Sequence, residues 1–215
     1  EENIIIYNKK KDDWSQIYLP SGIRKNFVND IITHNDKIWI ATPNGLQIMD
    51  IKTKRLFEND ITDEFKNIYI NDLLDNKIGI FIATQSGLFI YDYKNDTLLD
   101  YKEFGYRDSL LILPSSQTSF SAIAQYRGDV YFSSRESILK LSTSSRVWTS
   151  SVSSVIYQGQ EVVDFDVFKN DFFIATADML IHFDKKNNLP LYFNYNFLTN
   201  INKLKVNSRK LWIGT

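Results

Sequence analysis

One twelve-residue pattern occurs four times in this sequence and begins a fifth time. The copies are WIATPNGLQIMD at 39–50, FIATQSGLFIYD at 81–92, YFSSRESILKLS at 131–142 and FIATADMLIHFD at 173–184. The chain ends on LWIGT, in which Trp212 stands where Trp39 stands in the first copy. The five start positions are 42, 50, 42 and 39 residues apart, whereas the spacing inside each copy is constant. Such a division is typical of a structural repeat with loops of variable length between its units.

Each copy predicts a β-hairpin, because two apolar runs flank a short polar corner such as Pro43-Asn44-Gly45. An alternating apolar run precedes each copy, as at 27–37, and a further short run follows it, as at 55–60. The unit is therefore four short strands, which we label A to D, in about 43 residues. No useful length of the chain has a helical period. The sequence predicts an all-β fold, a β-propeller of four-stranded antiparallel blades.

Five such repeats fill residues 1–215, which we interpret as a single propeller domain or a fragment of one. The B–C hairpins are expected at 38–50, 80–92, 130–142 and 172–184, with a truncated one at 211–215. The N-terminal run at 4–18 fits the C–D half of a blade, in phase with the C-terminal A–B half. Two alternatives remain open at this point: a closed ring of five blades, which has no exposed strand edges, or part of a larger propeller.

Composition excludes several classes of function. The formal net charge is -1, with basic residues spread along the chain, so we predict no nucleic-acid partner. Cysteine is absent and only two histidines are present, so we predict no disulfide, no cofactor and no metal site. No apolar run approaches the roughly 20 residues that cross a bilayer, so we predict no membrane span within this chain.

The repeat resembles that of the two-component regulator propeller family. WIATPNGLQIMD, FIATQSGLFIYD and LWIGT carry its pattern of an apolar residue, Ile, Gly or Ala, Thr, two variable residues, Gly, Leu and a strand that ends in Asp. Blades three and four depart from it, with Ser137 and Met179 in place of the glycine, so their corner must differ. The resemblance implies a bacterial periplasmic or cell-surface location. It also implies a role as the sensor region of a hybrid two-component system or as a surface component of type IX secretion.

The A strands of a propeller line its central channel, and they supply the first candidate site. Nine positions before each B-strand aromatic stand Asp30, Asp72, Ala122, Asp164 and Lys203. Three acids and a lysine at one level predict a polar ring at the channel mouth, because carboxylates coordinate Ca²⁺ or accept hydrogen bonds from sugar hydroxyls. The alternative, which we favour, is that each aspartate accepts backbone N–H donors from a neighbouring turn and so locks blade to blade.

The connection between blades two and three supplies the second candidate site, because it is eight residues longer than its counterpart after blade one. It is expected to expose Tyr106 and Arg107 beside the B–C corner residues Asn44 and Arg135. The alternative, which we again favour, is a loop folded over a blade edge without a ligand. His34 is expected to be a solvated turn residue beside Asn35.

We weigh three functions. The first is a non-catalytic binding propeller for an oligosaccharide or a partner protein, with a homodimer implied by the resemblance alone. The second is an assembly role in a surface or secretion complex. The third is a glycoside hydrolase, which needs two carboxyl groups about 5 to 10 Å apart in unlike environments. Repeated equivalent positions tend to give like environments, so we predict that the chain is not an enzyme.

Overall fold

A computed structural model of the chain describes residues 3–18, 28–107, 111, 113–115, 117–135, 137–169, 171–177, 179–193, 201–207 and 210–214. Four complete blades follow one another in this part. They are β3 (Asp30–His34) to β6 (Leu56–Phe57), β7 (Ile70–Asn76) to β10 (Thr97–Asp100), β12 (Phe120–Tyr126) to β15 (Val147–Ser153), and β16 (Val162–Phe168) to β19 (Leu189–Phe193). The middle strands are β4 (Lys37–Thr42) and β5 (Gly45–Asp50), β8 (Gly79–Thr84) and β9 (Gly87–Asp92), β13 (Asp129–Ser134) and β14 (Ser137–Ser142), and β17 (Asp171–Thr176) and β18 (Leu180–Asp184). Each blade is an antiparallel meander in chain order, as the repeat predicts.

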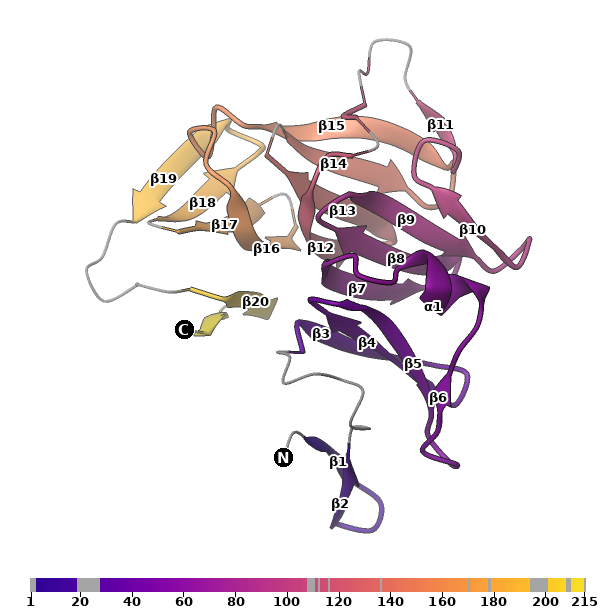
Figure 1. The fold of residues 1–215 in the computed structure, drawn as a ribbon. Helices are drawn as coiled ribbons and strands as arrows, with labels where there is room; N and C mark the ends of the chain where they lie inside the picture. Colours follow the sequence, from indigo (N-terminus) through magenta and orange to yellow (C-terminus); the bar gives the residue numbers. More distant parts are fainter. Residues whose placement is uncertain are drawn as a thin grey trace.

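Two hairpins flank these blades. β1 (Asn3–Asn8) pairs with β2 (Asp13–Tyr18), and β20 (Lys203–Asn207) pairs with β21 (Lys210–Gly214). Each hairpin forms its own two-stranded sheet in the described part of the chain, and Figure 1 shows the first one lying apart from the blades. The closed ring and the larger propeller therefore both stay predictions.

The repeated threonine stabilises the corner of the B–C hairpin, because its hydroxyl group bonds to backbone groups of the corner. The Thr42 hydroxyl donates to the Gly45 carbonyl at 2.7 Å and accepts the Asn44 N–H at 3.2 Å, and Thr84 does the same in blade two. In the two blades that lack the glycine, Ser134 and Thr176 also donate to the carbonyl three residues later. They accept the N–H of that same third residue, and not of the second, so the corner differs there as predicted. Gly45 has a φ of 132°, and a Cβ there would lie 2.6 Å from the Phe65 carbonyl oxygen.

The core lies between the blades, because the side chains of each inner strand alternate between two neighbours. All six residues of β8 are buried. Ile80 and Ile82 pack against blade one, whereas Phe81 and Ala83 pack against blade three. Both faces of each blade are therefore covered where a neighbour exists, and the blades fan out side by side in Figure 1. No helix among the described residues is long and apolar enough to cross a membrane.

Two short elements lie outside the predicted pattern. α1 (Asp60–Glu64) connects blade one to blade two, and Asn59 and Thr62 form a capping box at its start. β11 (Tyr106–Arg107) pairs in parallel with β15 and makes blade three a five-stranded sheet.

Candidate functional site

The three channel aspartates connect consecutive A strands. Asp30 Oδ2 accepts the Leu73 N–H at 3.1 Å, Asp72 Oδ2 accepts the Ile123 N–H at 2.7 Å, and Asp164 Oδ2 accepts the Leu204 N–H at 2.6 Å. Each donor residue directly follows the residue that occupies the aspartate's position in another repeat. The first two bonds join neighbouring complete blades, and the third joins blade four to the β20–β21 hairpin. The aspartates therefore lock blade to blade, as the structural alternative predicts, but their N–H donors lie in the A strands β7, β12 and β20 and not in turns.

An asparagine precedes two of these aspartates and adds a second bond between the same blades. The Asn29 amide donates to the Ile70 carbonyl at 2.6 Å, and the Asn71 amide donates to the Phe120 carbonyl at 2.8 Å. The repeated Asn-Asp pair is visible in the sequence, but its asparagine was not among the predicted site residues. In blade three the aspartate's position is taken by Ala122, which has no carboxylate. The Ala122 N–H donates to Ser133 Oγ at 3.0 Å.

Lys203 brings a positive charge to this ring. Its Nζ lies 3.2 Å from Asp72 Oδ1, and its side chain is half exposed. Burial raises the pKa of Asp72 to about 7, against the opposing charge of Lys203 and with a further rise from Asp30. Burial also raises the pKa of Asp164. Burial alone would lower the pKa of Lys203, but the nearby aspartates outweigh it and raise that pKa.

A cavity of about 940 Å³ opens at the start of the A strands. Its lining includes the residue before the ring position in all five repeats, namely Asn29, Asn71, Ser121, Val163 and Asn202, together with Lys203. Amides, a hydroxyl and an ammonium group from four of these repeats therefore converge there, and the fourth repeat adds the apolar Val163. Such a lining suits a polar ligand with several hydroxyl groups. No group of three or more potential metal-ligating His, Asp or Glu side chains is found within the described ranges.

The long connection after blade two folds over the outer edge of blade three. Tyr106 N–H donates to the Arg146 carbonyl at 2.7 Å, and Trp148 Nε1 donates to the Phe104 carbonyl at 2.6 Å. The Tyr106 side chain is 74% exposed beside Leu113 in a hollow of about 490 Å³. The described residues of the connection therefore lie over a blade edge, and a ligand-binding role for this loop stays a prediction.

The other residues predicted to surround this loop lie at separate corners. Asn44 is exposed at the corner of blade one and Arg135 at that of blade three. No hydrogen bond or ion pair in the described part of the chain joins either of them to Tyr106. The Arg107 side chain lies outside the described residues, and only its backbone pairing with Trp148 is placed.

The prediction for His34 is wrong. Its Nδ1 lies 3.1 Å from Asp75 Oδ2 and 2.9 Å from the Tyr93 hydroxyl, which donates to Asp75 Oδ1 at 2.6 Å. The His34 and Tyr93 rings stack with their centroids 4.5 Å apart. The last residue of β3 in blade one thus packs on blade two. Asp75 and Tyr93 are 41 and 59 residues away, so no local pattern could show the contact.

No protein-family model and no curated protein matches the sequence. Solved structures do match the fold. The extracellular domain of BT4673 from B. thetaiotaomicron, described as a one-component or hybrid two-component system, aligns over 99% of this chain with a TM-score of 0.71 and 16% identity. The corresponding domain of the hybrid two-component system BT3049 from B. thetaiotaomicron aligns over 95%, with a TM-score of 0.59 and 18% identity. The RRP9 WD40 repeats align over 83%, with a TM-score of 0.60 and 10% identity, and the chain covers 54% of that structure.

These likenesses confirm the β-propeller fold. The neighbours include extracellular domains of two-component systems, the kind of protein that the resemblance of the repeat implied. The chain spans 29% of the length of the BT4673 domain and 29% of the BT3049 domain.

Proposed function

We propose that this chain is a non-catalytic, extracytoplasmic binding propeller that recognises an oligosaccharide at the mouth of its central channel. The observation that carries the proposal is the 940 Å³ cavity, in which equivalent residues of five repeats meet. Cavities of this size hold small ligands, and side-chain amides both donate to and accept from sugar hydroxyls. Lys203 and Glu161 add one charged group of each sign to the lining.

The same geometry favours binding over hydrolysis. Asp30, Asp72 and Asp164 each hold a backbone N–H of another blade, and Asp72 and Asp164 are almost fully buried. A glycosidase needs two carboxyl groups on either side of the bond that it breaks. These carboxylates are occupied in holding the ring of A strands instead.

A periplasmic or cell-surface sensor role in a bacterial hybrid two-component system follows as part of this proposal. It is supported by the extracellular domains of BT4673 and BT3049, which share the fold. In such a protein the propeller would bind the ligand, and signalling parts elsewhere would respond.

The test is thermal-shift screening of the purified chain with neutral and uronic-acid oligosaccharides of varied linkage. A ligand that binds only the folded state raises the midpoint of unfolding by mass action. We expect one linkage to raise it. Asn202→Ala at the exposed rim of the cavity should abolish this rise, whereas Gln125→Ala, which removes an exposed amide at the other end of an A strand, should leave it unchanged. A flat response to every oligosaccharide would overturn the proposal.

One observation favours an assembly role as the second candidate. The outer strand β19 exposes Leu189, Leu191 and Tyr192, which are 59%, 54% and 44% accessible. An apolar edge strand is a surface on which another chain can pair. Sedimentation of the wild-type chain and of Leu191→Glu tests this: a dimer lost in the variant supports assembly, and a monomer in both removes it.

A further inference from the structure

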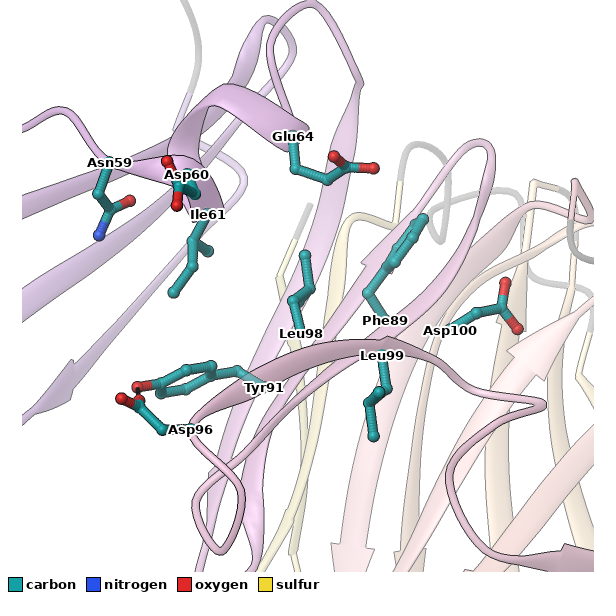
Figure 2. A pocket seen from close by; sticks show the side chains of 10 residues that line it. All are labelled: Asn59, Asp60, Ile61, Glu64, Phe89, Tyr91, Asp96, Leu98, Leu99 and Asp100. Carbon is teal, nitrogen blue, oxygen red and sulfur yellow. Dashed lines mark hydrogen bonds between the residues drawn. The ribbon is translucent and has the colours of Figure 1, made fainter.

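A second cavity, which we call the interblade groove, lies between blades one and two on their outer side. Its main part is about 720 Å³ and is shown in Figure 2. A hollow of about 440 Å³ adjoins it, and the two share Asn59, Ile61, Tyr91 and Asp96. None of the predicted site residues lines either part.

The interblade groove has an apolar floor. Ile61 on α1 and Phe89, Tyr91 and Leu98 on blade two face one space in Figure 2. The Phe65 ring supports Phe89 edge-on at 5.1 Å between centroids. The capping box of Asn59 and Thr62 fixes the start of α1, so the residues on both sides of the groove belong to ordered elements.

Carboxylates form the rim of this floor. Asp60 and Glu64 come from α1, and Asp96 and Asp100 come from blade two. None of the four forms an ion pair with a described residue. Asp96 accepts the Tyr91 hydroxyl, and Asp100 accepts the Lys102 N–H at 2.9 Å. The adjoining hollow includes Lys37, whose Nζ lies over the Phe57 ring at 4.5 Å.

Trp39 gives an independent sign of a missing partner. It lines the adjoining hollow and is 3% exposed. Its indole N–H is buried and has no hydrogen-bond acceptor among the residues that the structure describes. A buried donor without an acceptor is unfavourable, so an acceptor brought by a ligand would be favoured at this place.

We propose that the interblade groove binds a basic peptide segment of a partner protein. Arginine or lysine side chains of the segment would pair with the rim carboxylates and lie over the Phe89 and Tyr91 rings. A backbone carbonyl of the segment would accept the Trp39 N–H. A neutral oligosaccharide lacks the cation, and a polyamine lacks the acceptor, so a basic peptide fits the two observations together.

The probe is a set of fluorescein-labelled hexapeptides in which Arg or Lys alternates with apolar residues, with Glu-containing hexapeptides as the opposite-charge set. Binding to the full chain is measured by fluorescence anisotropy at low salt, where charge pairing is least screened. We expect members of the basic set to bind and the Glu set not to bind. In a ¹⁵N spectrum, the Trp39 indole signal, assigned with Trp39→Phe, should shift on binding while those of the other three tryptophans stay in place.

Two double variants test the location. Asp60→Asn with Glu64→Gln removes two rim charges, and Asp63→Asn with Glu103→Gln removes two exposed charges that do not line the groove. We expect the first to raise the Kd about tenfold and the second to change it less than about twofold. Equal losses in the two variants, an unmoved Trp39 signal, or no binding by any basic hexapeptide would overturn the proposal. Asn202→Ala at the channel mouth should leave peptide binding unchanged, so this proposal and the proposed function can fail separately.

Discussion

The two oxygens of the Asp72 carboxylate contact two other repeats. One oxygen accepts the Ile123 N–H and the other lies 3.2 Å from Lys203 Nζ, so the side chain connects three of the five repeats. The side chain is also deeply buried, which disfavours its charged form and raises its pKa to about 7. A fraction of folded molecules therefore carries this carboxyl protonated near neutral pH.

This raised pKa predicts a pH effect on stability. From about pH 4 to pH 7 the folded chain binds more proton at Asp72 than the unfolded chain, so the contribution of this group falls as pH rises. Asp72→Asn keeps a hydrogen-bond acceptor but cannot ionise. We expect the loss in free energy of unfolding between pH 5 and pH 8 to be about 1–3 kcal/mol smaller in the variant than in the wild type. Urea unfolding at the two pH values measures both, and equal losses in the two proteins would contradict the prediction.

Among the short elements, the connection that carries β11 can be divided into a buried part and an exposed part. Tyr101 is fully buried and donates to the Pro114 carbonyl at 2.5 Å, whereas the Tyr106 side chain is mostly exposed. The Tyr101–Pro114 bond therefore joins two parts of the connection, and the Tyr101 ring also packs edge-on against Trp148 of blade three at 5.7 Å between centroids, whereas Tyr106 contributes surface.

A pair of variants tests this division. Tyr101→Phe leaves the Pro114 carbonyl without its donor, and we expect it to lower the free energy of unfolding by about 1–2 kcal/mol. Tyr106→Ala should change it by less than about 0.5 kcal/mol. Thermal or urea unfolding of the two variants gives both values. A strongly destabilised Tyr106→Ala chain would show that this side chain belongs to the core of the connection.

The four-stranded blades could be predicted from the sequence because each repeats one hydrophobic pattern, and the short elements could not. α1 is only five residues long, and its one signal is the Asn59–Thr62 spacing of the capping box. β11 is two residues long and pairs with a strand about 40 positions further along the chain. Neither length is enough to produce a periodicity.

At the scale of the whole molecule, the blades differ in how much of each is covered by neighbours. β8 has a blade on both sides and is wholly buried. The β1–β2 hairpin is a separate two-stranded sheet that exposes Ile5 and Trp14. An isolated hairpin of this size is marginally stable in water.

Native-state hydrogen exchange should follow this difference. We expect the amides of β8 and β13 to exchange only through global unfolding and those of β1 and β2 to exchange orders of magnitude faster. Mass spectrometry of exchanged peptides measures both groups in one experiment. Equal protection of β1 and β8 would contradict this expectation and would show that the N-terminal hairpin joins another sheet, as a closed ring requires.

The candidate sites were predictable to the extent that the repeat determines them. The register of the repeat places Asp30, Asp72 and Asp164 at one height, so their common level at the channel could be predicted. The interblade groove could not, because Trp39, α1 and Tyr91 come from different repeats and only packing brings them together. Its residues follow no common offset within the unit.

The aspartate bonds all run in one direction, and this has a consequence for synthesis of the chain. In each bond the aspartate is synthesised first, and its N–H donor lies 40 to 51 residues nearer the C-terminus. At about 5–20 residues per second, a ribosome delivers that donor roughly 2–10 s later. In that interval the newest blade holds its carboxylate in water and its apolar face uncovered. The growing chain therefore always carries one unfinished unit at its leading end, and that unit is where chaperones would be expected to bind.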